Sequence, residues 1–481
     1  MNYSMVRYVL LRLIGVMGAL MVLPLIVALI YSEYDSAVCF FILAAVFALT
    51  GYLGTLKKPA NTVMFAKEGF AITAVAWIFM SLVGAIPFVA TGTIPNYIDA
   101  CFETVSGFTT TGGSILTAVD GMEKSVQFWR TFTHWIGGMG VLVFLIAVVP
   151  MADGYSMHLM RAESPGPVVG KIVPKVKDTA KILYMIYLAI TVVEIICLRL
   201  TGISLYEAVT LTFSTVGTGG FSVTNSGIGG YSILTQAVIT LFMALCGVNF
   251  TVYYFLIQRK PKEAFAIDEV KFYFGTLLIS SILISINIYR AGAVEGYGQS
   301  FHHSLFAVAS IMTTTGFGTL DFDKWPEFSR VLLMGLALVG ACAGSTGGGF
   351  KFSRALIVIR NARNELNFLV HPKAVKRVYL DGHVVEGTTV KSVSAYLCLY
   401  VVTLLASSLL VSLDNFDFQT TITAVIATLN NIGPGLGMVG PMGNYSEFSY
   451  LSKIVLMFDM LAGRLELLPI FIVIKPKTWK R

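Results

Sequence analysis

The stretch DACFETVSGFTTTGGS, residues 99–114, is the first of four stretches of the same design in this chain. Each has about a dozen moderately apolar residues and then a turn rich in Thr, Asn and Gly. The other copies are EAVTLTFSTVGTGGFS from Glu207, HSLFAVASIMTTTGFGT from His303 and TITAVIATLNNIGPGLG from Thr421. Such a stretch is too short to cross a bilayer, which takes ~20 helical residues, and too apolar for an exposed loop. Each copy therefore predicts a short helix that enters the membrane and returns as extended chain.

A constant spacing aligns the four copies. A step of thirteen residues from the start of each copy, with the fourth counted from Thr420, reaches a glycine every time. The four glycines are Gly112, Gly220, Gly316 and Gly433. The second copy offers other glycines one to three residues earlier, so its register stays open. We assign Gly220 because Phe follows it, as Phe follows Gly316.

Four such turns in one chain predict an ion site. Non-helical backbone at membrane depth is tolerated only where it is buried in protein or lines a water-filled path. Glycine permits positive φ, so successive carbonyls can face a common axis and replace the hydration shell of an alkali cation, as in potassium filters. The helices before the turns would aim their partly negative C-terminal ends at this axis. The candidate potassium-binding residues are Thr110, Thr111, Gly112, Gly219, Gly220, Thr315, Gly316, Asn431, Ile432 and Gly433.

The composition around these turns is that of a membrane protein. Of the 481 residues, 56% are hydrophobic and 13% are charged, whereas soluble domains carry about 25% charged residues. The expected membrane spans are 7–30, 37–55, 69–91, 126–150, 181–200, 232–257, 270–290, 329–359, 393–413 and 450–474. We therefore expect an all-α polytopic membrane protein with about ten transmembrane helices. Its expected parts are a two-helix extension over 1–68 and helix–pore-loop–helix repeats over 69–150, 151–258, 259–377 and 378–481.

Charge placement predicts the orientation. Lys and Arg gather in alternate connections, while the connections that carry the four turns are acidic or neutral, with Asp99 and Glu103 among their acids. Since cytoplasmic loops collect Lys and Arg, both termini are expected in the cytoplasm and the turns on the outer side, where acids would attract cations. The net charge of +7 is then an orientation signal and not a nucleic-acid footprint. The first apolar segment, too long for a signal peptide, is expected to remain as a helix.

The ordered turns Thr-Thr-Gly-Gly, Thr-Gly-Gly-Phe, Thr-Thr-Gly-Phe-Gly and Ile-Gly-Pro-Gly resemble those of the Trk/Ktr/HKT superfamily of cation transporters. The length and the two additional N-terminal helices look most like the pore-forming membrane subunit of bacterial Trk systems. In that family one glycine per turn marks potassium selectivity, and serine in the first turn is associated with sodium preference. The resemblance therefore implies a channel for potassium uptake in the inner (plasma) membrane, with potassium as substrate.

The resemblance also implies a gate below the filter, in the third repeat. The segment GACAGSTGGG, residues 340–349, lies midway through an expected span. Because glycine costs about 1 kcal/mol in a helix interior, an unwound loop is expected there; the alternative is close helix packing by small residues. Arg464 would act as an electrostatic barrier, or would form an internal pair with Glu466 or Asp459. The candidate gate residues are Gly344, Ser345, Thr346, Gly347, Gly348, Gly349 and Arg464.

The partners implied by the resemblance are a second copy, giving a homodimer, and a cytoplasmic ring of nucleotide-binding RCK-type subunits. The basic stretches 161–181 and 354–377 are candidate docking surfaces. This chain has no Walker A motif, and its six Cys and six His show no metal-ligand spacing, so we expect no cofactor and no enzyme. A transporter with inverted repeats is disfavoured because all four turns share one face. A proton- or sodium-coupled potassium symporter built on the same pore stays open.

Overall fold

The computed structural model describes residues 2–57, 59, 66–140, 176–373 and 376–479. Within these ranges the chain is helical apart from loops and one small antiparallel hairpin, β1 (Tyr379–Leu380) and β2 (His383–Val384). This confirms the all-α class. The basic stretch 161–181 lies mostly outside the described residues, as does the end of the span expected over 126–150.

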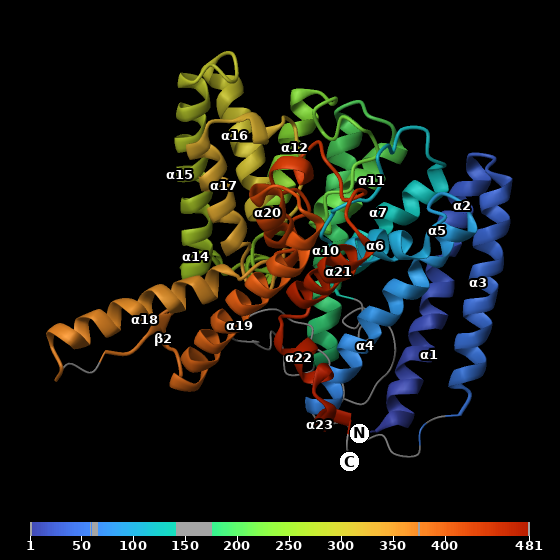
Figure 1. The fold of residues 1–481 in the computed structure, drawn as a ribbon, viewed down its shortest axis with the longest axis horizontal. Helices are drawn as coiled ribbons and strands as arrows, with labels where there is room; N and C mark the ends of the chain where they lie inside the picture. The colour runs from blue at the N-terminus through green and yellow to red at the C-terminus, as the bar shows by residue number, and fades with distance from the viewer. Residues whose placement is uncertain (1, 58, 60–65, 141–175, 374–375, 480–481) are drawn as a thin grey trace.

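Two long N-terminal helices stand at one edge of the molecule (Figure 1). They are formed by α1 (Tyr3–Leu20) with α2 (Val22–Ile30), and by α3 (Tyr34–Thr55). Small residues let these helices approach closely, because a side chain on Gly18 would meet the backbone of Ala48 within 3 Å. Such packing of small residues is typical of helices in membranes.

The rest of the chain repeats one arrangement four times: a helix, a short pore helix, a turn and a second helix. The first repeat has α4 (Ala66–Gly84), α5 (Ile86–Ala90), α6 (Tyr97–Phe108) and α7 (Lys124–Gly138). The second has α10 (Val176–Leu200), α11 (Leu205–Val216), α12 (Ile233–Cys246) and α13 (Phe250–Ile257). The third has α14 (Pro261–Ala266), α15 (Asp268–Arg290), α16 (Tyr297–Met312), α17 (Glu327–Val339) and α18 (Phe352–Val370). The fourth has α19 (Gly387–Val411), α20 (Phe418–Leu429), α21 (Tyr450–Arg464), α22 (Leu468–Ile474) and α23 (Pro476–Trp479).

The four short helices that the sequence analysis predicts as pore helices, and that keep this name below, are α6, α11, α16 and α20, with 12 to 16 residues each. Polar caps begin three of them. Asn96, Ser204 and Asp417 each accept a hydrogen bond from a backbone N–H of the first turn, and such caps stabilise helix starts by about 1 kcal/mol. The helices predicted from the four copies are therefore present at the expected places.

Several spans that look continuous in the sequence are broken in the structure. Among the described residues, six helices are long and apolar enough to cross a membrane, or seven if α12 and α13, bent by 91°, count as one. The spans expected over 232–257, 329–359 and 450–474 all break near their middles. In the last of these, Glu466 and Leu467 have positive φ, which is unusual for residues other than glycine.

The two ends of the described chain lie together on one side (Figure 1). The ring of Tyr3 stacks on Trp479 with centroids 6.5 Å apart, and the Tyr3 hydroxyl donates to the carbonyl oxygen of Trp479 at 2.8 Å. The start of the first described helix, α1, and the end of the last, α23, therefore lie on the same face of the molecule.

Candidate cation filter and gate

The four turns share one backbone conformation. Two positions in each have positive φ, and they are separated by one residue. The first position has φ between 55° and 59° and holds Thr110, Thr218, Thr314 and Asn431. The second has φ between 77° and 90° and holds Gly112, Gly220, Gly316 and Gly433. A β-branched residue in this region is strained, so the repetition indicates that the surroundings impose the turn. In the second copy Gly220 has positive φ, whereas Gly217 is helical at φ −69°.

Each turn uses its backbone N–H groups on its own pore helix. The residue before each filter glycine donates to a carbonyl oxygen near the end of that helix, at 2.8 to 2.9 Å. The four bonds run from Thr111 to Ser106, from Gly219 to Ser214, from Thr315 to Ser310 and from Ile432 to Ala427. These bonds hold each turn against the end of its own helix.

The turns close into a ring. Each filter glycine lies against the carbonyl oxygen of the residue before the glycine of the next turn, so close that an added Cβ would come within 3 Å of that oxygen. The contacts are Gly112 to Gly219, Gly220 to Thr315, Gly316 to Ile432, and Gly433 to Thr111. The ring therefore runs from the first turn through the second, third and fourth and back to the first. The ring contacts include eight of the ten residues that the sequence predicts for the filter. The other two, Thr110 and Asn431, directly precede Thr111 and Ile432 in the same turns.

Side chains brace the ring from behind. The amide of Asn431 donates to Thr111 Oγ1 at 3.0 Å and to the carbonyl of Met460 at 2.8 Å. Hydroxyl pairs within the first and third turns, Thr109 with Thr111 and Thr313 with Thr315, are each 2.8 Å apart. These bonds fix the carbonyl positions without placing a side-chain charge in the ring.

A cavity of about 160 Å³ opens outside the ring, and all four filter glycines line it. Among the described residues, no group of three or more His, Cys, Asp or Glu is placed to hold a metal ion. The donors that converge at the ring are carbonyl oxygens, which suit a desolvated alkali cation better than a transition metal.

The expected gate segment is a loop between α17 and α18, directly beneath the third and fourth turns. Gly340, which has positive φ, ends α17, and Gly344 and Gly349 have positive φ within the loop. The N–H of Gly348 donates to Thr314 Oγ1 at 2.6 Å, and a Cβ on Gly348 would meet the carbonyl oxygen of Asn430 within 3 Å. The loop is therefore packed against the third and fourth turns.

Arg464 joins this loop to the first repeat. Its guanidinium donates to the carbonyl of Thr346 at 2.8 Å and to the carbonyls of Gly137 and Gly138, the latter at 2.7 Å. A longer bond of 3.4 Å reaches Thr110 Oγ1 in the first filter turn.

The two carboxylates considered as partners of Arg464 make other hydrogen bonds. Glu466 pairs with Arg354, and Asp459 accepts from Ser407 Oγ at 2.7 Å.

Two residues that the sequence analysis missed hold the loop in place. Glu269, which is 4% exposed, accepts from the N–H groups of Ala343 and Ser353 at 2.7 and 2.8 Å. The ammonium group of Lys351, itself buried, donates to the carbonyl of Gly347. In the sequence, Glu269 and Lys351 stand out only as ionisable residues at the edge of an apolar span. Exposed ionisable residues at the ends of other spans look the same, so the sequence does not distinguish the two.

Comparison with known proteins supports these observations. The family model TrkH, described as a cation transport protein, matches residues 36–481. The Trk system potassium uptake protein TrkH of Salmonella typhimurium is 32% identical over 98% of this chain and 98% of that protein. The Trk system potassium uptake protein TrkG of Escherichia coli is 32% identical over 95% of this chain and 94% of that protein. The crystal structure of the potassium transporter TrkH from Vibrio parahaemolyticus matches with a TM-score of 0.87 at 29% identity, covering all of both chains.

Proposed function

The chain belongs to the TrkH family of cation transport proteins, and from this premise we propose that it takes up potassium across the cell inner membrane through one channel-like pore. The observation that carries the proposal is the closed ring of four turns, in which each glycine lies against a carbonyl of the next. The relatives named as potassium uptake proteins favour potassium as the substrate.

In this mechanism the ring acts as the selectivity filter. A cation that sheds its water needs oxygen ligands at fixed spacing, and the carbonyls of Thr111, Gly219, Thr315 and Ile432 stand at equivalent positions around the ring. Four pore-helix C-termini point their negative dipole ends toward the same place. These neutral donors bind a monovalent cation weakly enough to release it, as conduction requires.

The loop of residues 340–349 and Arg464 act as the gate. The loop packs under the filter, and the positive charge of Arg464, held against Thr346, opposes the passage of a cation. Opening requires this hydrogen bond to break and the loop to move away from the axis.

The proposed assembly is a homodimer that docks on a cytoplasmic ring of RCK-type subunits, with both termini in the cytoplasm. Figure 1 shows α18 extending away from the helix bundle. Near its end, Leu366, Leu369 and Val370 are 65% to 75% exposed. A protruding helix end with exposed apolar side chains is suited to contact with another subunit.

The function is tested by potassium flux into proteoliposomes of the purified protein, with sodium as competitor. Wild type and the gate variant Arg464→Ala should pass potassium selectively, and Gly316→Ser should lose the discrimination because its Cβ would collide with the carbonyl of Ile432. The matched control is Gly275→Ser, at a glycine in α15 with open space around it.

Absence of cation flux from both wild type and Arg464→Ala would refute the channel. Flux that needs a proton or sodium gradient would assign the chain to the coupled symporters instead.

A further inference from the structure

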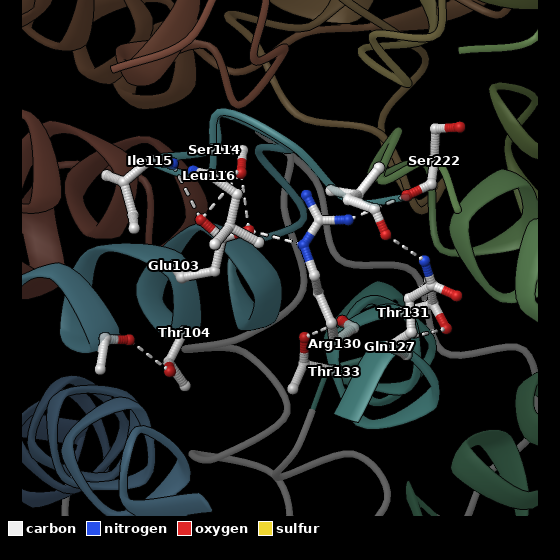
Figure 2. Close-up of polar contacts among 12 residues, drawn as sticks. Glu103, Thr104, Ser114, Ile115, Leu116, Gln127, Arg130, Thr131, Thr133 and Ser222 are labelled. Atoms are coloured by element: carbon white, nitrogen blue, oxygen red, sulfur yellow. Dashed lines mark hydrogen bonds and ion pairs between the residues drawn. The ribbon is translucent and has the colours of Figure 1, made fainter. Parts of the chain in front are cut away.

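A buried ion pair lies behind the first two filter turns (Figure 2). Arg130 Nε, on α7, donates to Glu103 Oε1, on pore helix α6, at 2.6 Å, and the two side chains are 3% and 0% exposed. Glu103 was counted above among the acids of the connections that carry the turns, but it is buried and is therefore not one of the exposed acids that would attract cations. A buried pair is costly unless further hydrogen bonds satisfy both charges, so the remaining partners show what the pair holds.

Glu103 binds the outgoing arm of the first turn. Its carboxylate accepts from Ser114 Oγ at 2.9 and 3.1 Å and from the N–H of Ile115 at 3.0 Å. Ser114 comes two residues after the filter glycine Gly112. The carboxylate therefore fixes the direction in which the chain leaves the ring.

Arg130 reaches from the same carboxylate to the second turn. Its Nη1 donates to the carbonyl of Ser222 at 2.9 Å, and its guanidinium carbon lies 3.6 Å from the ring centroid of Phe221. Phe221, which directly follows Gly220, also stacks on His134 at 4.1 Å. Arg130 thus holds the second turn, and its charge is balanced by Glu103, which binds the first turn.

Gln127, one helical turn before Arg130 on α7, spans the same two arms. Its amide donates to the carbonyls of Val119 and Val223, at 3.0 and 2.9 Å. Arg130 and Gln127 together make this face of α7 a bridge between the first and second turns.

The ion pair belongs to one junction of the ring. In the thirteen-residue register, the positions that correspond to Glu103 in the other copies hold Leu211, Ala307 and Ala424. Neutral bonds brace the third and fourth turns instead: Ser310 Oγ donates to the carbonyl of Phe317 at 2.6 Å, and the N–H of Leu436 donates to Thr423 Oγ1 at 2.9 Å. Loss of the ion pair would therefore distort one side of the ring and leave the rest in place.

We propose that Glu103 and Arg130 are positioning residues for ion selectivity, which set the spacing between the first and second filter turns. The proposal rests on the proposed filter function. Carbonyl oxygens held at a fixed spacing replace the hydration shell of potassium well. If that spacing is lost, the carbonyls can move closer together and bind the smaller sodium ion as well. Loss of the pair should therefore increase sodium flux relative to potassium flux, with a smaller effect on the potassium flux itself.

The test is the ratio of potassium to sodium flux in proteoliposomes. Glu103→Gln keeps the side-chain volume and removes the charge. Since a neutral amide binds Arg130 and the N–H of Ile115 more weakly than a carboxylate does, we expect the ratio of potassium to sodium flux to fall about tenfold or more. Arg130→Lys, which keeps the charge and loses the forked geometry, should give an intermediate ratio. The matched control is Thr104→Val, at a buried neighbour of Glu103 whose hydroxyl donates to the carbonyl of Ala100 within α6.

Equal losses of potassium and sodium flux in both variants, with the ratio unchanged, would overturn the proposal and leave the pair a purely structural element. If Glu103→Gln does not fold, Ser114→Ala, which removes one hydroxyl donor to the carboxylate, decides the question by the same ratio. A wild type without selective flux would instead refute the filter function itself.

Discussion

At the scale of single residues, the glycines of the four turns were predictable from the sequence, and the buried ion pair of Glu103 and Arg130 was not. Gly112 and its counterparts could be found because a constant spacing marks them. From the sequence alone, Glu103 cannot be told apart from an exposed acidic residue. Its partner Arg130 is 27 residues away in the chain. Burial of both depends on the packing of two turns that the local sequence does not specify.

The first residue-scale prediction concerns Glu269, which ties both ends of the gate loop to α15. Glu269→Ala leaves the N–H groups of Ala343 and Ser353 without this acceptor, and each unsatisfied group costs about 1–3 kcal/mol. We expect the loop to open more often, so that the buried thiol of Cys342 reacts faster with a maleimide. Labelling of the protein in nanodiscs, followed by mass spectrometry, measures the rate.

Glu269→Gln is the matched variant, because its amide oxygen still accepts a hydrogen bond and its labelling rate should lie between the other two. A Cys342 labelling rate that stays at the wild-type value in Glu269→Ala would contradict the role of Glu269 as a tether of the loop.

At the scale of elements, the pore helices follow from the sequence and the broken spans do not. A dozen apolar residues before a Thr/Gly turn predict a short helix wherever they occur. The break between α12 and α13 depends on a partner from another repeat, because the N–H of Phe250 donates to the carbonyl of Gly344 at 3.0 Å. The apolar sequence of the span does not predict a hydrogen bond to another repeat, so the span appears continuous in the sequence.

The prediction at this scale concerns the start of the fourth pore helix. Asp417 accepts from the N–H of Thr420 at 2.9 Å and from its hydroxyl at 2.5 Å, and these bonds lower the pKa of the Asp417 carboxyl. Asp417→Ala should destabilise the protein by about 1 kcal/mol at neutral pH. Thermal unfolding in detergent measures the loss, with the exposed Glu447→Ala as control.

The pH dependence of this effect has a definite sign. A carboxyl with a lowered folded pKa stabilises the protein fully above its unfolded pKa of about 3.9. That stabilisation disappears as the pH falls through the folded pKa, so wild type and Asp417→Ala should converge in acid. A difference in unfolding temperature that grows toward low pH would argue against the capping role.

At the scale of the whole molecule, four segments spread from residue 110 to residue 433 meet in one ring. The repeat predicts that equivalent turns converge. It does not predict which atoms hold neighbouring turns together, since those contacts differ from one junction to the next. The amide of Asn431 reaches Thr111 across 320 residues, and the ion pair of Glu103 and Arg130 lies at another junction. The repeated turns thus form the ring, and different side-chain contacts stabilise each junction between neighbouring turns.

The proposed function requires this ring to bind a dehydrated potassium ion, and the most direct test is a structure from crystals of the protein grown with rubidium as a potassium substitute. If rubidium replaces potassium in the proposed filter, an anomalous scattering peak is expected on the axis of the ring, coordinated by the carbonyl oxygens of Thr111, Gly219, Thr315 and Ile432. A ring without a peak, with rubidium bound instead at carboxylates elsewhere in the protein, would contradict it.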